Sequence, residues 1–470
     1  MAPPTNNSST VGIVVISILY AIALLHQLPL VWQDVHRLEA ATENSMFLAK
    51  SKRRPAVAEA NQNLTNAKQR AEIIAAYYND TQDQYDNQED YQKCKMNEPW
   101  PRTESHGCVV ESALTISYCQ FEHFRIDVAK IKSVRGGEAL TAVMGQAEDV
   151  EFPTYTKGAF QTMTPPNLPD VMPPARDMFY IHDVINALET KETQHCVKNF
   201  LGTTMFITRY EYCNLYHTMT DWWNTFLALS DPQAAKSIHL VFLDGHPQGN
   251  LDVVWEEIFA SVTYVQHLPK EGVCFEKAIL IPPGYMSQLW TRNRLFLVKR
   301  CPAMTDAFVK FMVAAHGLNH VQMIPGLVIL IERVPYIGHP RSQPGKAARI
   351  IQNMALVRDR LAKETTATQV RLVQFETMTF REQLELIRSA HVMIGNHGAG
   401  ITHLLFLNDG AHVLEFSQGA STMMTDMSAW KPKITHTLLP SVNSPLLSDE
   451  FVEHSLVPAV KNALNWTRSI

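Results

Sequence analysis

The sequence predicts an α/β protein with two Rossmann-like domains that face a cleft. Three observations predict this class: strand-length apolar segments alternate with amphipathic helical segments, the composition is 46% hydrophobic, and 470 residues exceed one average domain. The formal net charge of −5, without a long basic run outside 52–54, argues against nucleic acid as the main partner.

The first 93 residues predict a membrane anchor and a spacer. An uncharged apolar run opens the chain and, counted through Trp32, has about the 20 residues that one span needs. A cleaved signal peptide is the alternative, since Ala21 and Ala23 suit a cleavage site, but no positive charge precedes the run. The Ala-, Gln-, Asn- and Glu-rich segment that follows is typical of a stem. We predict a tail, an anchor and a stem at 1–10, 11–32 and 33–93.

Topology and redox state each leave two interpretations. Sequons at Asn63, Asn79 and Asn465 predict that the body of the chain is lumenal and glycosylated. Lys52 to Arg54, which follow the span, instead favour a cytoplasmic body. The seven cysteines form no CxxC pair and no zinc spacing. Either one disulfide forms among Cys94, Cys108 and Cys119 in an oxidising compartment, or these cysteines are buried thiols.

The first predicted domain spans 94–302. Apolar and aromatic residues at helical spacing predict a helix within 208–229, and an amphipathic segment predicts another at 251–260. Apolar runs predict strands at 238–243 and 277–281.

The second predicted domain spans 303–445, and a C-terminal segment at 446–470 packs back on the body through a helix at 449–466. Thr379 and Glu382 predict a capping box at the start of a helix over 380–390. The other elements expected here are helices at 303–317 and 346–361 and strands at 327–331 and 370–375.

The stretch 391–416 predicts a strand, a glycine turn, a short helix and a second strand. Gly395, Gly398 and Gly400 let the backbone approach a bound group, and the helix N-terminus favours phosphate. The unit is typical of a nucleotide-diphosphate cradle, although a tight turn that binds nothing has the same pattern.

Candidate acceptor-side residues follow the first strands. His217 and Asp221, four apart on one helix, form a candidate general base, or a structural pair. Trp222 and Trp223 are candidates for stacking on a sugar, though most helical tryptophans lie in a core. Asp244 ends a strand, where ligands of open α/β sheets bind. The chain has no Asp-x-Asp pair, so we predict no obligatory metal.

Candidate donor-side residues follow the later strands. Arg333, Arg341, Lys346 and Arg349 cluster after 327–331, and arginine forks match phosphate oxygens, although a solvated loop explains two of the four equally well. Glu415 is a candidate acceptor of hydrogen bonds from a ribose diol, or a buried acid that needs a partner.

Five blocks together resemble glycosyltransferase family 61, most closely its core β-1,2-xylosyltransferases of N-glycan processing. They are CNLYHTMTDWW (213–223), VFLDGH (241–246), VCFEKAIL (273–280), IERVPYIGHPR (331–341) and MIGNHGAGITH (393–403). The resemblance implies a GT-B-like fold, a UDP-sugar donor held by the C-terminal domain, and inversion. Family positions carry over to Arg333, Arg349, His397, Gly398, Ala399, Gly400, His217, Asp221 and Trp222. Asn396, Met354 and Ala355 depart from the plant pattern.

The resemblance implies a Golgi type II membrane enzyme that transfers xylose from UDP-xylose to O2 of the core β-mannose of N-glycans. Asp221, assisted or replaced by His217, is expected to deprotonate the acceptor. One alternative is a family member that uses UDP-N-acetylglucosamine or a UDP-arabinosyl donor on a protein or glycan hydroxyl. Another is an inactive membrane-anchored glycan-binding protein.

Overall fold

The computed structural model describes most of the body of the chain. The predicted tail, anchor and stem lie outside the described residues, as do Lys346 and the sequons at Asn63 and Asn79. Within the described part, no helix is both long and apolar enough to cross a membrane. The described residues are 106–109, 118–132, 135–168, 179–229, 232–284, 287, 289, 302–342, 349–417, 423–440 and 444–465.

The second sheet is fully parallel and doubly wound. Its five strands lie in the order β12-β11-β13-β14-β15, so the winding reverses between β11 and β13. Ligands of such sheets bind at this switch point, beyond the carboxyl ends of the strands. The strands are β11 (Leu327–Ile331), β12 (Gln369–Val373), β13 (Val392–Asn396), β14 (His412–Phe416) and β15 (Thr435–Leu439).

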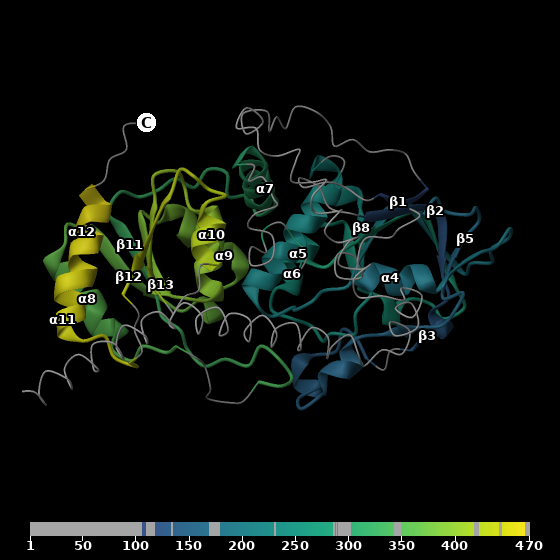
Figure 1. The fold of residues 1–470 in the computed structure, drawn as a ribbon, viewed down its shortest axis with the longest axis horizontal. Coiled ribbons are helices and arrows are strands. Elements are labelled where there is room, and N and C mark those ends of the chain that lie inside the picture. The colour runs from purple at the N-terminus through teal and green to yellow at the C-terminus, as the bar shows by residue number, and fades with distance from the viewer. Residues whose placement is uncertain are drawn as a thin grey trace, which may run out of the picture. The chain divides into compact units, whose positions relative to one another are not determined.

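Helices cover both faces of this sheet (Figure 1). Alternate residues of β11 point to opposite faces. Val328 and Leu330 pack with α8 (Met354–Glu364) and α12 (Val457–Asn465). Ile329 and Ile331 pack in the core that also holds α9 (Phe380–Ser389) and the 3-10 helix η10 (Ala399–Phe406). The predicted strand–turn–helix–strand unit is therefore confirmed, with a 3-10 helix as its helix.

Helix boundaries follow local chemistry. The predicted capping box is present: Thr379 accepts from the Glu382 N–H, and Glu382 accepts from the Thr379 N–H. The helix predicted at 346–361 begins only at Met354, because Arg349 has a φ of +65°, a left-handed value that ends any right-handed helix. The predicted C-terminal helix is confirmed, with a π-helical turn (Val452–Leu456) between α11 (Asp449–Phe451) and α12.

The first sheet is mixed, which corrects the prediction of a purely Rossmann-like first domain. Its order is β6-β5-β2-β10-β7-β8-β9, with β1 beside β2, and β2 runs antiparallel to β1, β5 and β10. Strands β10, β7, β8 and β9 are parallel neighbours. The strands are β1 (Gly107–Val109), β2 (Tyr118–Ile126), β5 (Phe160–Thr162), β6 (Leu188–Thr190), β7 (Lys198–Ile207), β8 (His239–Phe242), β9 (Ser261–Tyr264) and β10 (Val273–Ile281).

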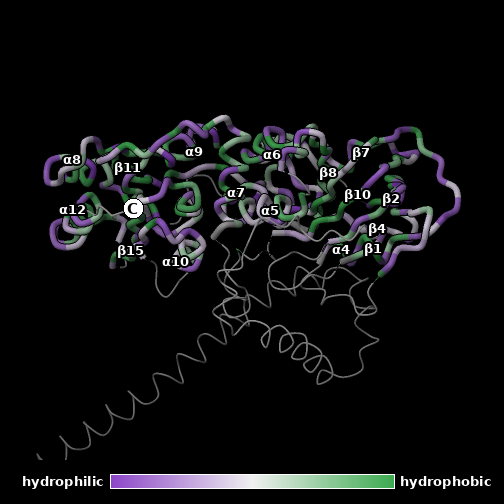
Figure 2. Tube along the Cα trace, turned by 90° about the horizontal axis from the view of Figure 1, so that it is seen from above, coloured by the Kyte–Doolittle hydropathy of each residue, from purple (hydrophilic) through white to green (hydrophobic). Residues whose placement is uncertain are grey.

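One hydrophobic core joins the two sheets. Residues of β7, β8 and β10 share it with residues of β11 and β13, and α5, α6 and α7 lie between (Figure 1). In Figure 2 hydrophobic stretches run along β8 and β10. Helix α4 (Phe179–Asn186) packs on the other face of the first sheet. The helices between the sheets are α5 (Leu215–Ala228), α6 (Asp252–Ile258) and α7 (Pro302–Ala315).

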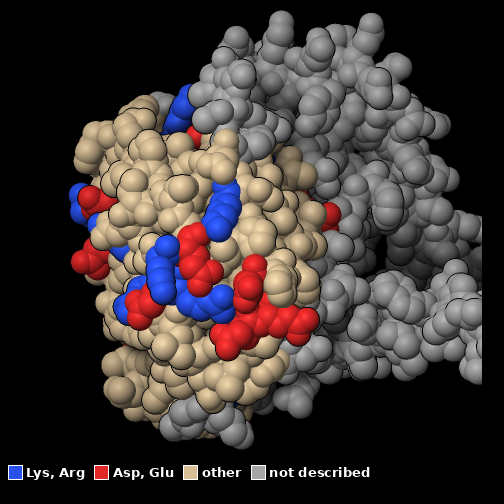
Figure 3. Space-filling view, turned by 90° about the vertical axis from the view of Figure 1, so that its left-hand side faces the viewer, with Lys and Arg blue, Asp and Glu red and all other residues tan. Residues whose placement is uncertain are grey.

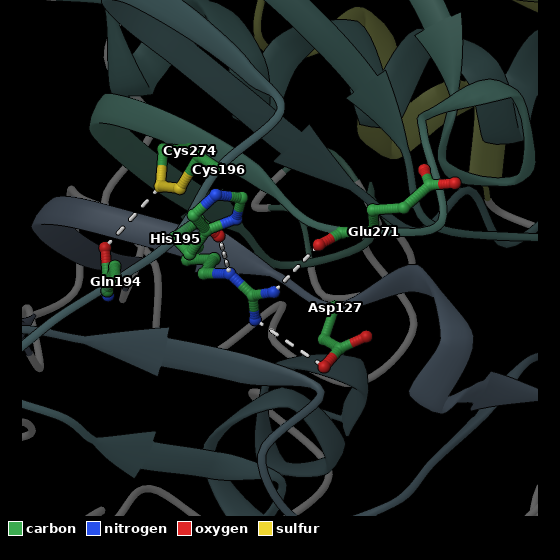
Figure 4. Close-up of a disulfide and its surroundings, with 7 residues drawn as sticks. Asp127, Gln194, His195, Cys196, Glu271 and Cys274 are labelled. Carbon is green, nitrogen blue, oxygen red and sulfur yellow. Dashed lines mark hydrogen bonds and ion pairs between the residues drawn. A yellow bond between two sulfur atoms is a disulfide. The ribbon is translucent and has the colours of Figure 1, made fainter.

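Two disulfides join strands of the first sheet. Cys108 and Cys119 are direct partners in the β1–β2 pair and form a disulfide, which agrees with the first of the two interpretations left open for the early cysteines. Cys196 and Cys274 form a second bridge that the sequence did not predict (Figure 4). Beside it, Arg125 donates to the carbonyls of His195 and Glu271, at 2.9 and 3.1 Å, which holds the segments that precede β7 and β10 together.

Exposed charges on the outer helices are paired. Arg360 of α8 contacts Glu364, Asp449 and Glu453, the last two from the C-terminal helical segment. Figure 3 shows basic and acidic side chains next to one another on the face that it presents. Such surface pairs contribute little to stability.

Candidate active site

The carboxyl ends of β11 and β13 bring the predicted donor residues together. Arg333 lies two residues beyond β11, and His397 and Gly398 directly follow β13. These are the two strands that flank the switch point of the second sheet. The donor residues therefore lie where a doubly wound sheet places its ligand.

The backbone at Gly398 leaves room for two guanidinium groups. A Cβ built at this position would clash with Arg333 Nη1 and lie 3.3 Å from Arg349 Nη1. Arg349 Nη1 also donates to the carbonyl of His397. Asn396, which departs from the family pattern, donates from Nδ2 to the Arg349 carbonyl at 3.0 Å and so holds that residue in its left-handed conformation.

The two arginines form a positive site that has no close ion pair among the described residues, although Glu376 interacts electrostatically with Arg333 and Glu415 with Arg349. Neither Arg333 nor Arg349 makes an ion pair with any carboxylate of the described residues. Burial lowers the pKa of Arg349, and the neighbouring Arg333 lowers it further, while Glu415 opposes the shift. Arg333 Nε is buried without a hydrogen-bond partner in the described structure. Adjacent, partly dehydrated guanidinium groups favour an anion between them.

Glu415 orients His397, so its predicted contact with a ribose does not fit the structure. Its side chain is buried, and its two oxygens are taken by His397 Nδ1 at 2.5 Å and His436 Nε2 at 2.7 Å. Burial opposes its ionisation, but the hydrogen bonds from the two histidines outweigh burial and hold the pKa of Glu415 below its ordinary value. The sequence did not point to His436, which lies on β15 beyond every quoted motif.

The candidate base residues on α5 differ in access. Asn214 caps this helix, which starts at Leu215. Asp221 is fully buried, accepts from the Gly284 N–H at 2.5 Å through Oδ1, and has no described partner at Oδ2. Burial raises the pKa of Asp221 well above its ordinary value, which favours the protonated form. His217 is partly exposed, with its ring 5.4 Å from that of Tyr210.

Trp222 and Trp223 belong to the core, which corrects the prediction that one of them stacks on a sugar. Their side chains are 1% and 0% exposed. Trp222 contacts Trp255 and Phe380, and Trp223 contacts Phe308 and Trp430. Indoles sealed between the sheets stabilise the junction and offer no face to a ligand.

Asp244 also has a structural role in place of the predicted acceptor contact. It lies fully buried at the end of β8 and makes a buried ion pair with Arg209, with 2.8 Å from Nη2 to Oδ1. Arg209 also contacts Asp252 at 2.6 Å. Burial opposes ionisation of Asp244, yet Arg209 outweighs it and lowers the pKa of that carboxyl. The sequence signal that could have pointed to Arg209 as the partner of Asp244 is its position two residues after the apolar end of β7.

The segment after β11 contacts the 3-10 helix Glu148–Glu151 and the turn at Gly145, beside the first sheet. Arg341 donates to both oxygens of the buried Glu151, at 2.8 and 3.2 Å, and His246 Nδ1 contacts the same carboxylate at 2.9 Å. The Gly145 N–H donates to the Pro340 carbonyl at 2.9 Å. Arg341 is thus committed to Glu151, and the phosphate-binding role considered for it does not fit.

The sequence-predicted residues therefore divide into two groups. Arg333, Arg349 and the turn His397 to Gly400 meet at the switch point, with the turn partly exposed, whereas Asp221, Trp222, Trp223 and Asp244 are enclosed. No group of three metal-ligating side chains occurs among the residues that the structure describes. Independence from metal stays a prediction.

The fold and the site define a class: an α/β protein with two adjacent arginines at the switch point of a doubly wound sheet. Residues 193–414 match the family Glycosyltransferase 61. The resemblance noted in the motifs is confirmed over these residues, which match a Glycosyltransferase 61 domain.

Similar proteins come from plants and animals. Beta-1,2-xylosyltransferase RCN11 of Oryza sativa subsp. japonica is 30% identical over 346 residues, covering 66% of this chain and 64% of the Oryza protein. Beta-1,2-xylosyltransferase of Arabidopsis thaliana is 26% identical over 378 residues, covering 66% of this chain and 70% of that protein. The EGF domain-specific O-linked N-acetylglucosamine transferase of Gallus gallus is 25% identical over 213 residues, covering 43% and 37%. The chain thus spans less than two thirds of the Oryza protein.

Proposed function

We propose that this chain is an inverting glycosyltransferase with a GT-B-like fold that transfers xylose from UDP-xylose to O2 of the core β-mannose of N-glycans. The two plant relatives, both named as β-1,2-xylosyltransferases, support the choice of sugar and linkage. The observation that carries the proposal is the convergence of Arg333 and Arg349 on Gly398.

The arginine pair suits a nucleoside diphosphate as the leaving group. When the bond between C1 of the sugar and the phosphate oxygen breaks, negative charge grows on that oxygen. Guanidinium groups fixed in place before the reaction stabilise this charge more in the transition state than in the ground state. Arg349 is held by hydrogen bonds with the His397 carbonyl and with Asn396, so its position needs little rearrangement.

The displacement is a single in-line step. The acceptor hydroxyl loses its proton to a base on the first-sheet side, where His217 lies partly exposed, and its oxygen attacks C1 as UDP departs. One C–O bond forms and one breaks, with inversion at C1. No metal is required in this scheme, and a transfer rate unchanged by a chelator is the expected result.

The test is transfer by the purified protein from a panel of UDP-sugars to an N-glycan acceptor, followed by mass spectrometry. A pentose increment from UDP-xylose alone is expected. Arg333→Lys and Arg349→Lys should each weaken UDP binding, since a lysine cannot reproduce the planar fork. Transfer that is unchanged in both variants would contradict the role of the arginine pair.

A second candidate uses UDP-N-acetylglucosamine on a protein hydroxyl. The similarity to EGF domain-specific O-linked N-acetylglucosamine transferases favours it. The same panel of UDP-sugars separates the candidates. A hexosamine increment on a folded protein acceptor would support the N-acetylglucosamine transferase. An increment from a UDP-arabinosyl donor would support arabinosyl transfer. UDP binding without transfer from any donor would indicate the inactive glycan-binding protein.

We also propose that the body is lumenal, as in a type II Golgi membrane protein with its anchor at 11–32. The two disulfides of the first sheet support an oxidising compartment. Asn465, the described sequon residue, is exposed at the end of α12. Removal of N-glycans from the expressed protein should therefore increase its gel mobility, and a protein without N-glycans would contradict this topology.

A further inference from the structure

Two carboxyl groups near His217 differ in their exposure to solvent. Asp221 is fully buried inside α5, and its Oδ2 has no described partner. Glu211, in the loop between β7 and α5, is partly exposed. Its Oε1 accepts from the Tyr212 N–H at 3.2 Å and from Cys213 Sγ at 3.3 Å, and Oε2 makes no hydrogen bond with a described residue.

Local contacts hold Glu211 beside the exposed end of α5. Thr218 Oγ1 donates to the Glu211 carbonyl at 3.3 Å, which ties this residue to the turn of the helix that carries His217. The preceding residue, Tyr210, places its ring 5.4 Å from that of His217. The backbone of Glu211 therefore lies against the turn of α5 that carries His217.

The loop that carries Glu211 also meets the segment from the donor side. Tyr212 stacks on His339 with ring centroids 5.8 Å apart. Glu211, Cys213 and Arg333 all influence the pKa of Tyr336, which burial raises to about 12. Tyr336, with an exposed fraction of 42%, lies three residues after Arg333 on this segment.

The charge state of Glu211 suits a base. Burial opposes its ionisation, but interactions with His246, His339 and His217 outweigh burial and lower the pKa of Glu211. Asp221 shows the reverse shift. When the environments of two nearby carboxyl groups shift their pKa values in opposite directions, the group with the lower pKa can accept a proton and the group with the higher pKa keeps its own.

We infer that Glu211, beside His217, is the catalytic carboxylate that takes the proton from the acceptor hydroxyl, in place of the buried Asp221. The inference rests on the proposed glycosyl transfer. The acceptor O–H bond breaks and its proton goes to Glu211 Oε2. The acceptor oxygen forms the bond to C1 of the donor, and UDP leaves with the electron pair of the broken C–O bond. The proton then passes to solvent.

The test compares Glu211→Gln, Asp221→Asn and the matched control Glu192→Gln, whose residue is exposed on the loop after β6. Glutamine keeps the Oε1 hydrogen bonds and removes the base, so kcat should fall by about 10²- to 10⁴-fold. The KM for the UDP-sugar should change by no more than about threefold, because the diphosphate contacts are unaltered. Asp221→Asn should lose far less, and the control should match the wild type.

Chemical rescue separates a base from a structural residue. Glu211→Ala should recover part of its kcat when formate is added, and Asp221→Ala should not. A Glu211→Gln protein with wild-type kcat, or an Asp221→Asn protein that folds and loses as much as Glu211→Gln, would overturn the inference. A wild-type protein that uses another UDP-sugar overturns only the xylose assignment, and one that transfers nothing from any donor overturns both.

Discussion

Gly398→Ala is the sharpest perturbation of the donor site. Gly398 has φ +150° and ψ −174°, a backbone region that is essentially restricted to glycine. The added Cβ would clash with Arg333 Nη1 and lie 3.5 Å from its Cζ, so this guanidinium must shift away from the turn. Arg349, with Nη1 3.3 Å away, needs only a small shift.

Two magnitudes follow from this geometry. Backbone strain should reduce the free energy of unfolding by about 1–3 kcal/mol, which a denaturant titration measures. Displacement of Arg333 removes one charge-assisted hydrogen bond to the diphosphate, worth about 1.5–3 kcal/mol, so the Kd for UDP should rise about 10- to 150-fold. Isothermal titration calorimetry with UDP measures that change without any assumption about the sugar.

Gly410→Ala is the matched control in the same strand–turn–helix–strand unit. Gly410 has φ +87°, and a Cβ there would meet nothing within 4 Å. Its variant should lose stability through strain and keep wild-type UDP affinity. Equal affinity for UDP in Gly398→Ala and the wild type would refute the arginine site, as would equal weakening in both variants.

Three further predictions concern the residues that support the site. Because the pKa of Glu415 is depressed in the folded protein, ionised Glu415 contributes its full stabilisation above the ordinary pKa of 4.5, and this contribution is lost as the pH falls through the folded pKa. Glu415→Gln should therefore reduce the loss of stability at acid pH, measured by urea titrations at several pH values. An unchanged loss would contradict the pKa shift. Asp244→Ala should lower the free energy of unfolding by up to about 3–5 kcal/mol, because it leaves the buried Arg209 paired with Asp252 alone. UDP affinity of the folded protein should stay the same, and weaker UDP binding with normal stability would contradict the structural role. Trp223→Ala should lower the free energy of unfolding by about 3–5 kcal/mol in denaturant titrations, because it leaves a cavity between the sheets. A variant of normal stability whose only defect is a higher KM for the acceptor would support the stacking role instead.

The second sheet could be predicted from sequence because its signals are local. Its buried parallel strands are continuous apolar runs, as at 327–331, and Thr379 and Glu382 fix the start of α9 by a contact across three residues. The first sheet gave weaker signals. Its antiparallel strand β2 (Tyr118–Ile126) lies in a region where the sequence shows no clear alternation of strands and helices. The place of β2 between β5 and β10 depends on pairings between residues far apart in the sequence.

The site divides in the same way. Arg333 and the turn at Gly398 follow apolar strands, so the rule that ligands bind beyond strand ends finds them. The same rule selected Asp244, but the sequence could not reveal that Arg209, 35 residues earlier, neutralises it in the core. The position of Asp221 toward the core is equally a tertiary property, since His217 on the same helix remains partly exposed.

The short segment 333–341 after β11 has one end near the second sheet and the other end near the first. Arg333 stands at the anion site of the second sheet, and eight residues later Arg341 is fastened to Glu151 beside the first. Eight residues reach at most about 28 Å when fully extended. The segment therefore couples the position of Arg333 beside the glycine turn to the contact between Arg341 and Glu151, and a change at either end is expected to be felt at the other.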